Sequence, residues 1–152
     1  MAHRVLASRP TPDVSDAIAL WLRSTASASP VPTDHHLVEI AGVLTDHGRM
    51  DLQLLQRLSQ SATVQARAYA ARVTGHWMER LPAVAGSPEL NTALDHLTRL
   101  AGDPHPRVRL EAVVACSTVP DARAVGVAAI ATDLPMEPAI EYAFTQCVQA
   151  LK

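Results

Sequence analysis

The stretch LAGDPHPRVRLEAVVAC, residues 100–116, decides the fold of this chain. It predicts the end of one helix, a tight turn and the start of a second helix. Pro104 and Pro106 favour this break, because proline fits a helix only in its first turn. Asp103 lies where its carboxylate can accept free amide groups at the new helix start. In the second helix the apolar residues recur at helical spacing, at Val108, Ala112, Ala115 and Val119.

The composition favours helices that pack closely. Hydrophobic residues make up 48% of the 152-residue chain, whereas aromatic residues make up only 3%. At this length the chain is one domain or one piece of an elongated one. Its formal charge of −2 and pI of about 6.4 weigh against a nucleic-acid partner, because such binders carry a basic excess. No apolar run approaches the length of a membrane span, so no membrane association is expected.

Internal repeats organise the rest of the chain. When the sequence is slid along itself, residues 6–14 fall on residues 100–108 with five of nine positions identical, and a shorter shift places Asp103 on Asp133. The shift that places Arg67 on Arg109 also superimposes several Leu and Ala residues. That shift is close to the interval of roughly 40 residues that is typical of HEAT and armadillo repeats. The unequal intervals predict irregular repeats.

Helical spacing and helix-breaking residues predict an all-α fold of about 7–8 helices and no sheet. Residues 1–8 resemble the last turns of an outer helix, and residues 24–33, rich in Ser, Ala and Pro, form an irregular loop. Asp34 is expected to cap the helix that follows the loop. The helix over 13–25 is expected in the inner layer, with five residues on its buried side: Val14, Ala17, Ile18, Trp21 and Leu22. The further helices are expected over 35–46, 50–60, 62–76, 88–101, 106–117, 120–132 and 138–151.

The pattern Asp-x-x-x-x-Val-Arg at residues 103–109 resembles the inner turn of a HEAT repeat. In that family the Asp and Arg side chains form a ladder between neighbouring repeats. The resemblance implies an α-α superhelix, a HEAT-like solenoid, that spans residues 1–152 as a single repeat domain. It also implies a structural ladder made by Asp103 and Arg109, together with Arg67 one repeat earlier.

Residues 50–152 carry a narrower resemblance. The runs LLQRL (54–58), ARAYAARV (66–73), GHW (75–77) and DPHPRVRLEAV (103–113) are similar to the HEAT region of large exported bacterial proteins. In those proteins this region lies between a sugar-dehydrogenase-like β-propeller and a c-type cytochrome domain. This chain has no propeller and no CxxCH haem motif, so the resemblance implies a scaffold role without redox activity. It also leaves the location open: exported if the chain is a fragment of such a protein, and cytoplasmic if it is free-standing.

The residues that carry chemistry elsewhere form no catalytic pattern here. There is no GxSxG motif and no Gly-rich phosphate loop, so we expect a non-enzyme without cofactor or metal. The adjacent His35 and His36 would point about 100° apart on a helix, which is poor geometry for one ion. Cys116 and Cys147 both fall on apolar helix stripes. They are expected as buried free thiols, with a disulfide between adjacent helices as the alternative.

The expected function is a non-catalytic scaffold that binds a protein partner or neighbouring domains of the same polypeptide. Its candidate interaction surface comprises Arg107, Trp77 and His76, although Trp77, like Trp21, also suits a gap between helices. A first alternative is a nucleic-acid-handling module similar to HEAT-like DNA glycosylases, built on Arg67, Arg107, Arg109 and Trp77. A second is a tetrapyrrole-handling module similar to HEAT-like phycobilin lyases. That module needs a pocket with His or Arg at its rim.

Overall fold

The computed structural model of the chain describes residues 10–25, 32–80 and 86–151. Within these ranges every regular element is helical and no strand is present, which confirms the all-α class. The expected helix over 1–8 and most of the expected loop over 24–33 lie outside the described residues. The helices are α2 (Thr11–Thr25), α3 (Asp34–Asp46), α4 (Leu52–Ser59), α5 (Val64–Arg80), α6 (Pro88–Ala101), α7 (Pro106–Cys116), α8 (Arg123–Ala129), the 3₁₀ helix η1 (Ile130–Asp133) and α9 (Pro138–Ala150).

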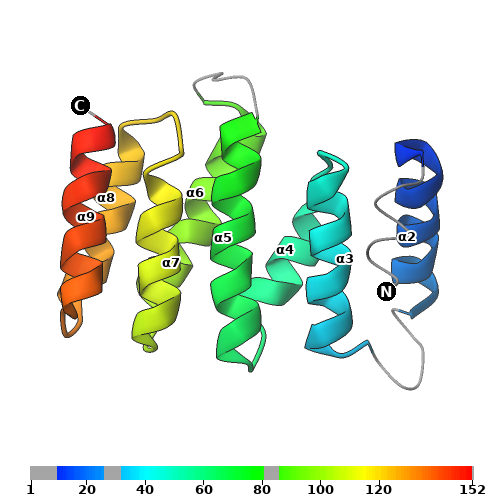
Figure 1. The fold of residues 1–152 in the computed structure, drawn as a ribbon, viewed down its shortest axis with the longest axis horizontal. Helices are drawn as coiled ribbons and strands as arrows, with labels where there is room; N and C mark the ends of the chain where they lie inside the picture. The colour runs from blue at the N-terminus through cyan, green and yellow to red at the C-terminus, as the bar shows by residue number, and fades with distance from the viewer. Residues whose placement is uncertain (1–9, 26–31, 81–85, 152) are drawn as a thin grey trace.

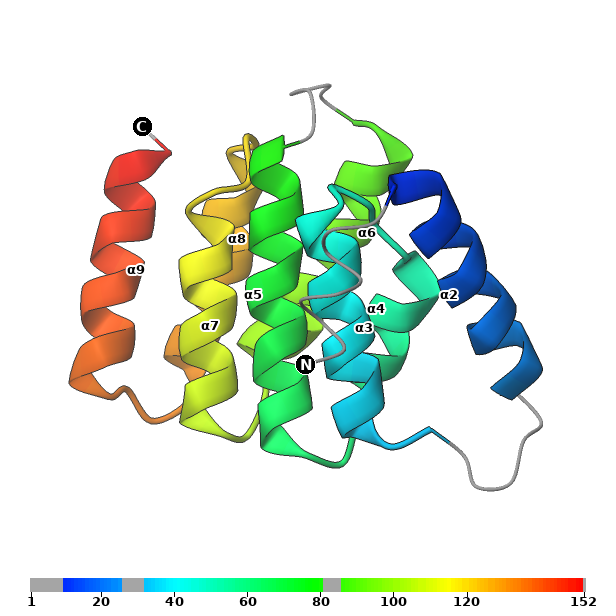
Figure 2. The same cartoon turned by 45° about the vertical axis from the view of Figure 1, so that its right-hand side comes forward.

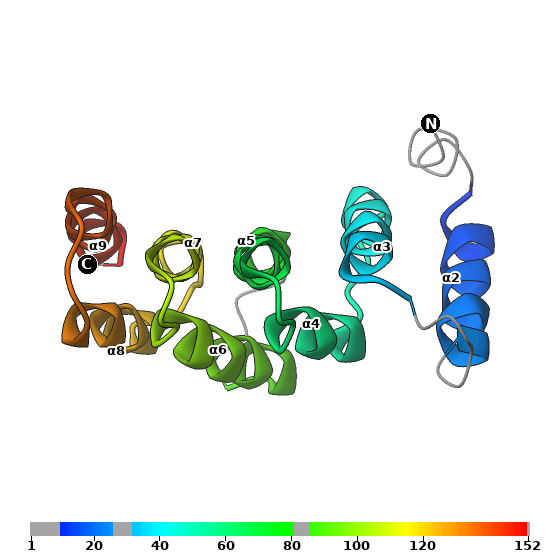
Figure 3. The same cartoon turned by 90° about the horizontal axis from the view of Figure 1, so that it is seen from below.

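The helices from α3 onward form two layers (Figures 1 and 3). Helices α3, α5, α7 and α9 lie side by side and run in the same direction, with their N-terminal ends on one edge of the molecule. Helices α4, α6 and α8 form the second layer, which crosses the first obliquely (Figure 3). The contact between α5 and α7 is the most extensive in the structure.

Local sequence signals start these helices. The carboxylate of Asp51 accepts the amide of Leu54 at 2.9 Å and caps α4, and the hydroxyl of Ser87 accepts the amide of Leu90 at 3.1 Å and caps α6. Each bond satisfies an amide that has no partner inside its helix. The expected cap at Asp34 is wrong by one residue. Thr33 is the N-cap of α3 and Asp34 is its first helical residue.

Small side chains let neighbouring helices of the same layer approach closely. On α5, four alanines are buried: Ala66, Ala68, Ala70 and Ala71. A Cβ placed on Gly75 would lie 2.9 Å from both Cα and Cβ of Ala115 on α7, so α5 and α7 touch there backbone to backbone. The predicted apolar stripe of α7 and its C-terminal flank is confirmed, because Val108, Ala112, Ala115 and Val119 are all buried.

Helix α2 differs most from the prediction. It runs antiparallel to α3 and lies beside it at the end of the stack, outside the layer of α3, α5, α7 and α9 (Figures 2 and 3). Val14 and Ile18 are buried, but Ala17 is exposed and Trp21 is 36% exposed, so the inner-layer placement and these two core positions were wrong. The reason is topological: α3 already occupies the next inner position, since its Asp34 accepts hydrogen bonds from the turn before α5.

The other helix bounds differ from the prediction by more than two residues in two places. Helix α5 continues to Arg80, past the expected end at residue 76, because Trp77 and Met78 remain buried against the core. The helix expected over 120–132 is divided into α8 and the 3₁₀ helix η1. In the described part of the chain, no helix combines the length and apolar character that crossing a membrane requires.

Candidate interaction surface, turn network and cleft

Three residues singled out in the sequence meet in the turn before α7. Asp103 lies within hydrogen-bond distance of Arg67 on α5 at two atom pairs, Nε to Oδ2 at 2.7 Å and Nη2 to Oδ1 at 3.2 Å. Oδ1 of Asp103 also accepts the amide of His105 at 2.8 Å. A bidentate arginine–carboxylate pair fixes both distance and orientation. It therefore ties α5 to the turn that starts α7.

Arg109 makes the corresponding contacts one unit later. Its Nη1 donates to the carbonyls of Asp103 and Pro104, both at 3.1 Å, and its Nη2 donates to the carbonyl of Pro135 at 2.7 Å. Arg67 likewise donates from Nη1 to the carbonyls of its own turn, Ser61 at 2.9 Å and Ala62 at 3.1 Å. Arg109 follows Arg67 in the sequence by the same interval by which Asp103 and Pro104, whose carbonyls Arg109 binds, follow Ser61 and Ala62, whose carbonyls Arg67 binds. Each arginine thus closes its own turn and reaches the next.

Together these contacts make a turn network, which we define as six residues: Asp34, Ser61, Arg67, Asp103, Arg109 and Pro135. At its start, the hydroxyls of Ser61 and of Thr63 (2.9 Å) donate to Oδ2 of Asp34. Ser61 occupies the place of Asp103 in the earlier unit. The Ser61 hydroxyl donates to Asp34 on α3, whereas the carboxylate of Asp103 accepts from Arg67 on α5. Sequence reasoning missed this first link because Asp34 was expected to serve only as a cap.

Two details of the expected ladder are corrected. Asp103 is not the N-cap of α7: His105 is, and its imidazole Nδ1 accepts the amide of Arg107 at 3.2 Å. Asp133, on which the shorter repeat shift places Asp103, lies within η1 and is not part of the turn network. Arg109 binds the carbonyl of Pro135 instead, in the connection that follows η1 and leads to α9.

The electrostatics of Asp103 follow from this packing. Burial acts to raise the pKa of its carboxyl group, but the hydrogen bonds from Arg67 and from the His105 amide outweigh burial, and the pKa falls below the ordinary value. The hydrogen bond to Asp103 in turn raises the pKa of Arg67. Both groups are therefore charged at neutral pH, and each stabilises the charge of the other.

The layer of parallel helices presents a distinct outer surface, which we call the parallel-helix face: Tyr69 and Arg72 on α5, and Arg107, Glu111 and Val114 on α7. Arg72 and Glu111 form an ion pair across the two helices. Val114 is 47% exposed although it is apolar. The pKa of Tyr69 is raised first by burial and then by the nearby carboxylates of Asp46 and Glu39 on α3. The face thus combines acidic, aromatic, basic and apolar groups.

The three residues of the predicted interaction surface differ in their exposure to solvent. Arg107 is exposed in the first turn of α7, and His76 is partly exposed with its Nδ1 3.6 Å from the carboxylate of Glu79. Trp77 is only 3% exposed, so its inclusion in a surface is wrong and its alternative role as a core residue is the one observed. Position 77 points inward because α5 continues past residue 76 against the core.

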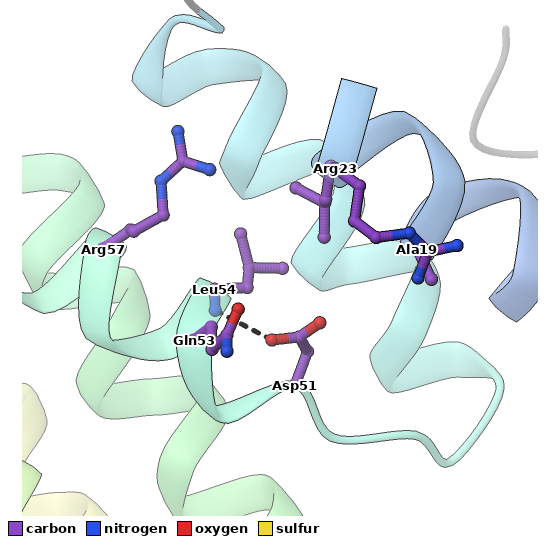
Figure 4. A pocket seen from close by; sticks show the side chains of 7 residues that line it. Ala19, Arg23, Asp51, Gln53, Leu54 and Arg57 are labelled. Carbon is purple, nitrogen blue, oxygen red and sulfur yellow. Dashed lines mark hydrogen bonds between the residues drawn. The ribbon is translucent and has the colours of Figure 1, made fainter. Parts of the chain in front are cut away.

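A cleft opens between α2 and α4 (Figure 4). Its volume is about 690 Å³, and its lining combines apolar with charged side chains: Ala19, Leu22, Arg23, Asp51, Gln53, Leu54 and Arg57. Arg23 and Arg57 lie on opposite sides of it (Figure 4). No sequence signal marked this site, because its walls come from two helices whose packing the sequence alone does not give.

The cysteines are buried free thiols, and the disulfide alternative is not observed. Burial raises the pKa of both thiols, that of Cys116 to about 12. Among the described residues, no three His, Cys, Asp or Glu side chains are grouped so that they can hold a metal ion.

Comparison of the chain with protein-family models, with curated proteins and with solved structures finds no significant match.

Proposed function

We propose that this chain is a non-catalytic HEAT-like solenoid that holds a protein partner, or neighbouring domains of its own polypeptide, on the parallel-helix face. The observation that carries the proposal is the repeated role of Arg67 and Arg109. Each closes the turn before its own helix and reaches the next turn. A contact pattern that recurs at the interval of the sequence repeat is the expected sign of stacked repeats, in which each unit contacts only its neighbours.

The turn network supports the scaffold role mechanically. It fixes the register between consecutive helix pairs through charged or backbone acceptors, and hydrogen bonds to charged groups are stronger than those between neutral groups. The close approach at Gly75 adds a second fixed point, where the Thr118 hydroxyl donates to the Gly75 carbonyl at 3.0 Å. Helices α5 and α7 are thereby held in a fixed relation, so a partner would meet a preformed surface.

The chemistry of the parallel-helix face suits a protein partner. Interface cores are enriched in aromatic residues and arginine. Here Tyr69 and Arg72 lie on α5, and an exposed Val114 lies on the next helix of the same layer. The carboxylates of Glu39 and Asp46 at its border would contribute selectivity through charge, as complementary charges do at protein interfaces.

Most of the residues on which the nucleic-acid alternative depends are not available to bind a nucleic acid. Arg67 and Arg109 are occupied within the turn network, and Trp77 is buried, so only Arg107 of the expected set is exposed. The tetrapyrrole alternative requires a pocket with His or Arg at its rim. The cleft between α2 and α4 meets that requirement with Arg23 and Arg57.

Site-specific photo-crosslinking in the native host tests the scaffold proposal. A benzophenone amino acid at Val114 probes the parallel-helix face, and the same group at the exposed Asp95 of α6 probes the opposite layer. The proposal expects a discrete cross-linked protein from position 114 that is absent from position 95. The same products from both positions, or none from position 114, would overturn it.

A further inference from the structure

The cleft between α2 and α4 has the size and the mixed lining of a small-molecule site. Its volume of about 690 Å³ lies within the range of roughly 300–1,000 Å³ that is usual for ligand pockets. Ala19 and Leu22 supply apolar surface, and Arg23 and Arg57 supply charge from opposite sides (Figure 4). Such pockets bind an apolar body and orient it with a few polar groups.

The two arginines of the cleft differ from the arginines that join the helix units. Arg67, Arg72 and Arg109 each bind a carboxylate or a carbonyl. Within the described part of the chain, neither Arg23 nor Arg57 forms an ion pair or a side-chain hydrogen bond. Their planar guanidinium groups thus have donors available for a carboxylate or phosphate, which arginine binds in a bidentate manner.

The acidic residue of the cleft is already occupied. Oδ1 of Asp51 accepts the amide of Leu54 at 2.9 Å as the cap of α4 (Figure 4). Asp51 is therefore held at the first turn of α4. Among the described residues, it forms no ion pair with Arg23 or Arg57. Because two arginines face one aspartate, the lining carries a net positive charge.

We propose that this cleft binds a small amphipathic organic anion. Arg57 and Arg23 attract its carboxylate or phosphate group, and its apolar body lies against Ala19 and Leu22. The site is separate from the parallel-helix face, so it stands or falls independently of the scaffold function. Burial of the apolar body supplies affinity, and the arginines select for negative charge.

The test uses the anionic dye 8-anilinonaphthalene-1-sulfonate on the full chain, followed by its fluorescence. The proposal expects saturable binding that octanoate or octyl phosphate displaces and that neutral octanol displaces much more weakly. The anion that displaces the dye at the lower concentration identifies the preferred head group, carboxylate for octanoate or phosphate for octyl phosphate. Equal displacement by octanol and by both anions, or no saturable binding, would overturn the proposal.

Matched variants locate the site. Arg57→Gln is expected to weaken dye binding about tenfold, the effect of losing one charged hydrogen bond, and Arg107→Gln on α7 is expected to leave it within about twofold. Arg23→Gln serves the same purpose if Arg57→Gln does not fold, as judged by circular dichroism. Amide chemical shifts that change on octanoate addition should be confined to α2 and α4. Unchanged binding in both cleft variants, or shift changes centred on α7, would contradict the assignment.

Discussion

The guanidinium of Arg67 and the carboxylate of Asp103 meet across two helix units through contacts of 2.7 and 3.2 Å. Asp103 is only 7% exposed, so the pair is largely shielded from water. The same carboxylate receives the His105 amide, and the carbonyl of the same residue receives Arg109. One aspartate thus joins α5, α7 and its own turn.

Asp103→Ala should therefore lower the free energy of unfolding by about 1–3 kcal/mol, because it leaves a charged, partly buried guanidinium without its partner. Urea unfolding measures the loss. Asp121→Ala is the control: it removes an ion pair with Arg123, whose side chain is 53% exposed and can be solvated by water, so its loss should be smaller. If Asp103→Ala and Asp121→Ala unfold at the same urea concentration as the parent chain, the turn network does not stabilise the fold.

The contribution of Asp103 should also depend on pH. Its pKa in the folded chain lies below the ordinary value of 3.8, so the unfolded chain binds more protons between the two values. Its stabilising effect is fully present above the ordinary value and is lost as the pH falls through the lower, folded value. The stability difference between the parent chain and Asp103→Ala should accordingly shrink in acid. A difference that stays constant from neutral pH to the acid limit would show that the carboxylate charge is not what stabilises the turn.

Gly75→Ala should destabilise the chain by about 1–3 kcal/mol, because the new methyl group would overlap Ala115 across the contact between α5 and α7. Gly126→Ala is the matched control. Gly126 lies within α8 with nothing within 4 Å of the added Cβ, so alanine there should stabilise the helix by about 0.5–1 kcal/mol. Thermal unfolding compares the two variants. Equal effects would mean that α5 and α7 are not in backbone contact at Gly75.

The thiols of Cys116 and Cys147 should be unreactive in the folded chain. Both side chains are buried, and at neutral pH the raised pKa of Cys116, about 12, leaves almost no thiolate, the form that reacts with Ellman's reagent. Labelling should become complete in urea. Tyr142→Cys, which adds a thiol at an exposed position, should label at once under native conditions and serves as the control. Rapid labelling of the parent chain would contradict the packing between α7 and α9.

Capping and spacing made part of this fold predictable. The Ser-Pro-Glu start at residue 87 and the proline break at residues 104 and 106 predicted the bounds of α6, Pro88–Ala101, because caps and proline breaks act over a few residues. The repeat interval paired Arg67 with Arg109, and Asp103 followed from its place in the turn. Trp77 and Trp21 were harder to place, since a large apolar side chain suits either a core or a binding surface.

The sequence by itself determined the all-α class, most helix positions and the residues of the turn at Asp103, because helix propensity, caps and proline breaks are local. Only the tertiary structure decided the position of α2, the role of Pro135 as the last acceptor and the cleft between Arg23 and Arg57. Each of these depends on how two distant segments pack. Such packing is fixed by the shape and volume of side chains far apart in the chain, which no local pattern encodes.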